Sequence, residues 1–146
     1  MIGLDTNVVV RYLTHDDPAQ TAAAVRAMDS LSPDSPGFLS LIVMTEFVWV
    51  LEVSYRFKKG EIAEVLEVSY RFKKNEIERV LDTLLRSKEL VIERAEIVWQ
   101  ALRKFGAGRA DFADCLIERC GHAAECQYTV TFDQNAAGAA GMRLLR

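Results

Sequence analysis

Short apolar segments that alternate with helical patterns constrain the fold of this chain more than any other feature. Met1–Leu4 and Tyr128–Thr131 have the composition of buried strands, and Asp5 and Asp133 follow close behind them. Strands alternating with helices predict an α/β fold in which helices cover both faces of a parallel sheet. Ligands of such sheets bind beyond the carboxyl ends of the strands. We therefore expect Asp5 and Asp133 to belong to one functional site.

The other expected elements follow from spacing and from helix-capping signals. Thr6 or Asn7 can cap a first helix, and Asp17 followed by Pro18 is a strong start for a second. The Gln-, Asn-, Ala- and Gly-rich run 134–141 is expected to be a mobile loop. The remaining expected strands are residues 38–39, 90–93 and 142–145, and the expected helices are residues 6–13, 17–28, a segment that begins after Ser40 and carries Glu46, 95–105 and 111–120.

Length and composition indicate a single globular domain over residues 1–146. Half of the residues are apolar, yet no uninterrupted apolar run is long enough to span a membrane. The first residues lack a basic region and a cleavage site, so we expect a cytoplasmic protein. The three cysteines form no CxxC pair and are expected to be ordinary thiols, and neither histidine accompanies a nucleophile motif.

The net charge of −3 and the pI near 5.4 exclude a protein that coats nucleic acid through bulk attraction to phosphate. A nuclease remains compatible with this charge if it uses a local basic patch and bridging metal ions. Part of the negative charge would then belong to the metal site itself. The acidic composition therefore argues against a protein that coats nucleic acid but not against a nuclease.

Four carboxylates, Asp5, Glu46, Asp114 and Asp133, interrupt or end apolar stretches. An ionised carboxylate in such a place is destabilising unless a positive group pairs with it. No Lys or Arg has a comparable place beside any of the four. Clustered carboxylates without His or Cys suit a hard cation. The sequence therefore predicts one or two Mg²⁺ or Mn²⁺ ions.

A tandem repeat occupies the middle of the chain, with copies at residues 50–64 and 65–79. Residues 50–62 recur at 65–77 with one change, Gly60 to Asn75. Helical spacing in the second half of the repeat predicts an additional short helix, and a single longer helix across the junction is the alternative. Alternating aromatic and basic residues can also hold RNA. The RNA-contact candidates are Arg11 and the repeat's Arg56, Lys58, Lys59, Arg71, Lys73 and Lys74, with Arg103, Lys104 and Arg109 as further phosphate contacts.

The Leu-Asp-Thr-Asn opening, the Thr-Glu-Phe helix, the Asp-Phe-Ala-Asp helix and the Thr-Phe-Asp strand end resemble a PIN domain, specifically a VapC-type ribonuclease toxin. The resemblance implies a Rossmann-like parallel sheet of four to five short strands, with a helical clip that the duplication extends. It implies a metal cluster of Asp5, Glu46, Asp114 and Asp133. Thr6, Asn7 and Thr131 would orient these carboxylates and their waters, while Asp111 would cap its helix or act as an outer ligand.

The resemblance also implies a function. A metal-bound water would attack an RNA phosphodiester in line, without a protein nucleophile. The substrates would be tRNA or ribosomal RNA, and the partners a VapB-type antitoxin and a second copy of the chain. A catalytically weak PIN protein that only binds RNA or antitoxin is the alternative. A haloacid-dehalogenase-like phosphatase would need a second Asp at position 7, where this chain has Asn7. A receiver domain would need an acidic pair before its phosphorylated Asp and a later Lys, and neither is well placed in this chain.

Overall fold

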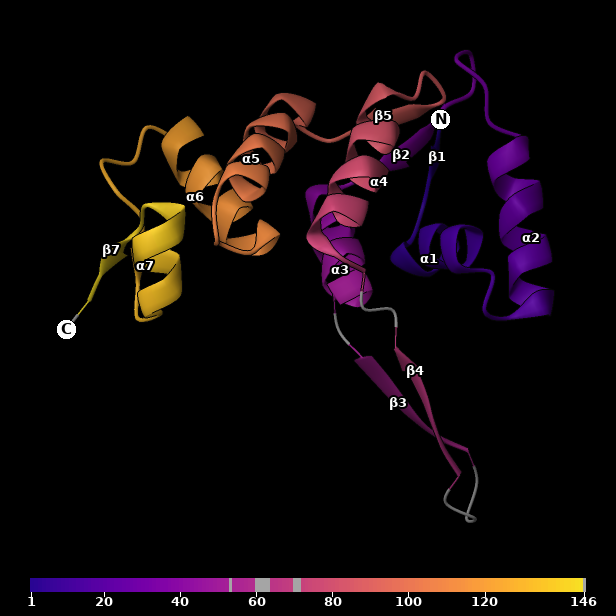
Figure 1. Cartoon of the computed structure of the whole chain (residues 1–146). Coiled ribbons are helices and arrows are strands. Elements are labelled where there is room, and N and C mark those ends of the chain that lie inside the picture. Colours follow the sequence, from indigo (N-terminus) through magenta and orange to yellow (C-terminus); the bar gives the residue numbers. More distant parts are fainter. Residues whose placement is uncertain (53, 60–63, 70–71, 146) are drawn as a thin grey trace.

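The computed structural model describes residues 1–52, 54–59, 64–69 and 72–145, which form helices and short strands of an α/β fold (Figure 1). Figure 1 places β1, α1 and α2 at one end of the molecule and α7 and β7 at the other, with α3, α4, α5 and α6 between. In chain order the elements are β1 Ile2–Gly3, α1 Thr6–Thr14, α2 Pro18–Asp29, β2 Gly37–Leu39, α3 Leu41–Glu52, β3 Ser54–Lys59, β4 Glu64–Ser69, α4 Lys74–Arg86, β5 Leu90–Ile92, α5 Ala95–Ala107, α6 Phe112–Ala123, β6 Val130–Thr131, α7 Gln134–Ala140 and β7 Arg143–Leu144.

The parallel strands confirm the predicted fold class, but in the described residues they form two sheets. β1, β2 and β5 make a sheet in that spatial order, with Ile2 opposite Gly37 and Gly37 opposite Leu90. β6 and β7 pair separately, also in parallel. The expectation of one sheet of four to five strands therefore differs from the structure. β1 and β6 are two residues long, so each supports only a short ladder of hydrogen bonds.

Helix starts agree with the capping signals, except at the first helix. Asp17 accepts a hydrogen bond from the backbone N–H of Gln20 at 2.9 Å, as the sequence indicated. α1 begins after Asp5, which is its N-cap, so the assignment of the cap to Thr6 or Asn7 was wrong. The extended backbone of Asp5 continues from β1 and leaves Thr6 free to adopt helical geometry.

The run after Asp133 is a helix, α7, and the expectation of a mobile loop there was wrong. The Asp133 side chain accepts hydrogen bonds from the backbone N–H groups of Asn135 and Ala136 and so caps the helix. Ala136 and Ala140 are fully buried, and Gly141 ends the helix in the left-handed conformation. Small residues that suggested flexibility instead allow close packing.

The duplicated segment does not add a helix. Its described central residues form an antiparallel pair, β3 and β4, that projects from the body of the molecule (Figure 1). Both helical predictions were therefore wrong for residues 54–59 and 64–69, where β-branched and aromatic residue types favour strands. The Phe72 N–H donates to the Leu51 carbonyl at 3.0 Å, so the chain re-enters the body beside the point at which it left. Residues 60–63 and Arg71 lie outside the described residues.

α4 begins after Lys73, which is its N-cap. The Glu76 side chain accepts from the Lys73 N–H at 2.6 Å, which satisfies one of the free donors at the helix start. Ile77 and Leu81 then enter the main core together with Phe47, Leu51 and other residues of α3. No helix in the described part of the chain is long and apolar enough to cross a membrane.

Candidate active site

The first group of predicted site residues lies where β1, α1 and α3 meet. The buried Thr6 hydroxyl donates to the Glu46 carboxylate at 2.5 Å, across 40 residues of sequence. Asp5, directly before Thr6, is exposed at the carboxyl end of β1. Thr6 thus holds one carboxylate from α3 next to the strand end that presents another.

The second group lies at the N-termini of α6 and α7. Asp111 caps α6 by accepting from the Asp114 N–H at 2.8 Å, as preferred from the sequence. Partial burial, followed by the charges of Asp111 and Asp133, raises the pKa of Asp114. The Thr131 hydroxyl accepts from the Asp133 N–H at 3.0 Å and fixes the strand end that carries this carboxylate. Three like charges therefore share one region of the structure.

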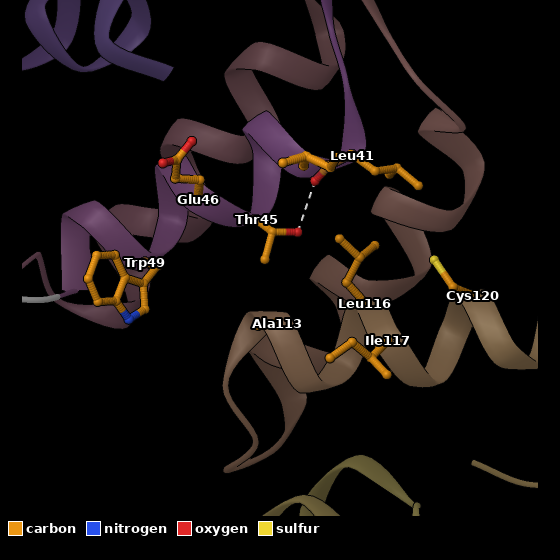
Figure 2. A pocket seen from close by; sticks show the side chains of 9 residues that line it. Leu41, Thr45, Glu46, Trp49, Ala113, Leu116, Ile117 and Cys120 are labelled. Atoms are coloured by element: carbon orange, nitrogen blue, oxygen red, sulfur yellow. Dashed lines mark hydrogen bonds between the residues drawn. The ribbon is translucent and has the colours of Figure 1, made fainter. Parts of the chain in front are cut away.

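An apolar groove between α3 and α6 lies beside both groups (Figure 2). Glu46 lies on its α3 wall, and Ala113, the neighbour of Asp114, lies on its α6 wall. The groove holds about 560 Å³, and the exposed side chains of Ile42, Trp49 and Ile117 stand along it. The sequence analysis did not predict this groove. The apolar residues of α3 are not confined to one side of the helix, and this was a signal that more than one of its faces packs against apolar groups.

The donor chemistry of the two groups fits a hard divalent cation, because every candidate ligand is a carboxylate oxygen. The mutual repulsion recorded at Asp114 is what such a cation would relieve. Within the described ranges, however, no set of three or more acidic, His or Cys side chains is placed to hold a metal ion. The structure brings Thr6 to Glu46 and Asp114 to Asp111 and Asp133, and it does not gather all four carboxylates.

Asn7 does not contact either group of carboxylates through a recorded hydrogen bond. It lines a separate shallow pocket between α1 and α2, together with Val8, Arg11 and Gln20. Arg11 itself binds Asp16 at 2.7 Å and Gln20 at 2.9 Å. Asn7 and Arg11 therefore face α2 and the residues that precede it, where their contacts stabilise the fold.

The basic candidates have separate surroundings. Arg103 and Lys104 line an open pocket of about 450 Å³ with Gln100 and Arg119, a residue that sequence analysis did not select. Glu118 binds both Lys104 and Arg119 at 2.7 Å, and these contacts, chiefly that of Arg119, hold its pKa at about 2. The remaining candidates are Arg56, Lys58 and Lys59 in β3, Arg71 outside the described residues, Lys73 at the start of α4, Lys74 in α4, and Arg109 in the turn before α6.

Comparison with known protein families identifies the chain. The family model described as PIN domain matches residues 2–141, which is nearly the whole chain. A search of curated proteins found no match. The matched range includes both groups of carboxylates, the groove between α3 and α6, and the duplicated segment. The chain belongs to the PIN domain family.

Proposed function

We propose that this chain is a Mg²⁺- or Mn²⁺-dependent endoribonuclease and the toxin component of a VapBC-type pair. PIN domains are generally nucleases that use divalent metal ions, and the four candidate carboxylates lie within the matched range. The observation that carries the proposal is the family match over residues 2–141, within which the carboxylates of Asp111, Asp114 and Asp133 act on one another. Carboxylates that repel one another are held together at functional sites more often than elsewhere.

Two sets of residues would perform the reaction. Asp114 and Asp133 would hold the cation from α6 and β6, and Asp5 and Glu46 from β1 and α3, with Thr6 fixing the Glu46 carboxylate. The bound metal would supply Lewis-acid stabilisation of the phosphoryl oxygen and a water of lowered pKa. The cationic pocket of Arg103, Lys104 and Arg119 would bind backbone phosphates of the RNA beside the site.

The two groups of carboxylates would need to approach each other for catalysis. β1 pairs with β2 on one edge, and no described strand covers its other edge, where Ile2 is 51 % exposed. Val130 of β6 is 46 % exposed and Phe132 is 80 % exposed. Pairing of β6 beside β1 would cover these side chains and would place Asp133 next to Asp5 at the same edge of one sheet.

The test is cleavage of total tRNA and ribosomal RNA with Mg²⁺, Mn²⁺ or EDTA. Wild type should produce discrete fragments only with metal, and Asp114→Asn should produce none. The matched control is Asp34→Asn, which removes the same charge from an exposed loop and should cut like wild type. Equal cleavage by the two variants would reject the assignment of Asp114.

The alternative is a PIN protein that binds RNA or antitoxin without cutting. The separation of the carboxylates into two groups favours it, because no metal-holding set forms in the described residues. Retention of labelled tRNA by a folded wild type, without fragments in any metal, would support this alternative. The same experiment therefore decides between the two functions.

We also propose that the groove between α3 and α6 binds a second copy of the chain. Ile42 is 78 % exposed, Trp49 52 % and Ile117 54 %, and such contiguous apolar side chains mark protein interfaces. A two-fold dimer would place the same patch on both subunits. Ile42→Lys and Ile117→Lys should convert a dimer into a monomer in light scattering, whereas Ile2→Lys on another face should not. A monomeric wild type would reject this interface.

A further inference from the structure

Lys74, at the start of α4, contacts the turn between α5 and α6. Its ammonium group donates to the Gly108 carbonyl and lies 4.5 Å from the centre of the Phe105 ring. Its charge also acts on the half-buried Glu52, whose pKa is raised by burial and by Asp111 and is lowered by Lys74. One cation therefore joins the end of α3, the end of α5 and the turn that follows.

That turn presents the acidic end of α6. Gly108 is the C-cap of α5, and only Arg109 and Ala110 separate it from Asp111, which caps α6 and holds the Asp114 N–H. Below the turn, Phe105 and Phe112 pack edge to face with centroids 6.1 Å apart. α4 approaches the backbone between these two rings at two places: the Lys74 ammonium donates to the Gly108 carbonyl, and the Glu78 side chain lies beside Gly106.

The sequence repeat contains a second lysine at the position equivalent to Lys74. Lys59 stands at the equivalent place in the first copy, after the same Tyr-Arg-Phe-Lys sequence. Lys59 ends β3, which pairs with β4 and with no other described strand. The same local sequence thus occupies two different places in the fold, and local sequence alone does not decide which lysine meets the turn.

We propose that Lys74 is a positioning residue that holds the 108–111 turn, and through it the carboxylates of Asp111 and Asp114, in place for metal binding. The proposal rests on the proposed nuclease function for its catalytic consequence. The bond to the Gly108 carbonyl needs a donor and the attraction to the face of the Phe105 ring needs a positive charge, and the Lys74 ammonium supplies both. Lys74 does not touch the reacting groups, so its effect is on metal affinity and turnover and not on RNA binding.

The first experiment compares Lys74→Met, Lys74→Arg and Lys59→Met. In Lys74→Met the amides of residues 108–114 should exchange with solvent about tenfold faster, as expected when a charged hydrogen bond is lost. Mn²⁺ affinity and kcat should fall by a similar factor, with KM for RNA unchanged. Lys74→Arg should restore both, because arginine also donates and stacks. Lys59→Met should leave the exchange of residues 108–114 and the Mn²⁺ affinity as in wild type.

A second experiment needs no substitution and so does not depend on the folding of a variant. Wild type is treated briefly with an acetylating reagent, and the peptides are quantified by mass spectrometry. The reference is Lys88, an exposed lysine in the turn after α4. The Lys74 amine should react about tenfold more slowly than the Lys88 amine, since its hydrogen bond to Gly108 must break first. Equal reactivity of the two lysines would overturn the proposal.

The readouts separate this proposal from the nuclease function. Unchanged exchange at residues 108–114 in Lys74→Met overturns the positioning role, whether or not wild type cuts RNA. Faster exchange with a wild type that binds no Mn²⁺ supports the hold on the turn and rejects the metal site. Faster exchange together with weakened Mn²⁺ binding supports both.

Discussion

At the scale of single residues, the charge of Asp114 is disfavoured by its own surroundings. Partial burial and two neighbouring carboxylates raise its pKa, so the folded chain holds a proton that the unfolded chain releases. Folding stability from this group therefore falls as pH rises through the pKa values of Asp114 in the unfolded and then the folded state. A site that binds a cation has such unfavourable electrostatic energy when the cation is absent.

The prediction is that Asp114→Asn melts at a higher temperature than wild type when both are free of metal at neutral pH. With Mn²⁺ the order should reverse, because binding to the folded state stabilises wild type alone. Differential scanning fluorimetry with EDTA and with Mn²⁺ measures both. Asp34→Asn is the control, and an Asp114→Asn variant that gains as much from Mn²⁺ as wild type would contradict the assignment.

Glu118 has the opposite shift. Its contacts with Arg119 and Lys104 lower its pKa from 4.5 to about 2. A lowered pKa in the folded state means that the stabilisation is present above pH 4.5 and is lost as pH falls toward 2. We expect Glu118→Gln to be less stable than wild type at pH 7, with the difference shrinking between these values. Urea unfolding at several pH values checks this, and a constant difference would contradict it.

At the scale of elements, the sequence predicted those whose signals are local. Asp17, Pro18 and Gln20 define the start of α2 within four residues, and the structure places it there. α7 was missed because its stability comes from the burial of Ala136 and Ala140 and from the Asp133 cap, which composition does not reveal. β3 and β4 were missed because a helical spacing and a strand composition coexist in the repeat, and tertiary context decides between them.

Deletion of residues 51–65 should leave a chain that folds and is more stable by about 1 kcal/mol, because a shorter connection loses less entropy on closure. Leu66 would then take the buried place of Leu51. The matched control deletes residues 51–66, which puts Glu67 in that place. The control should be destabilised by several kcal/mol, on the order of 3. Equal thermal stability of the two deletion variants would contradict the prediction that Leu66 takes the buried place of Leu51.

At the scale of the whole molecule, the position of β6 relative to β1 was the feature that local patterns did not determine. Asp5 and Asp133 are each at a strand end, as predicted, but the strands belong to different sheets. Pairing between distant strands depends on long-range packing, which is not encoded in a short window of sequence. The strand ends that carry Asp5 and Asp133 were therefore predictable, and their position relative to each other was not.

If metal assembles the site, Mg²⁺ should shorten the distance between spin labels at Ser35 and Gln127. These exposed positions lie before β2, beside the start of β1, and before β6, so the labels would move together as the strands pair. Double electron–electron resonance measures the distance, in a background without the native cysteines. The Asp114→Asn variant is the control and should show no shortening. An unchanged distance in wild type that cuts RNA would contradict closure.

The hydrogen bond between Phe72 and Leu51 joins the two ends of the projecting segment, and the sequence repeat in that segment has a consequence for the gene. Loss of fifteen codons starting anywhere from position 50 to position 60 yields the same protein, because the two copies agree across that interval. Slippage during replication can therefore remove the extra copy by many equivalent events, while each event leaves α3, the junction and α4 with the residues they now contain. Removal of one copy should accordingly leave the folded body of the protein with the residues it now has, wherever within the repeat the removed stretch begins.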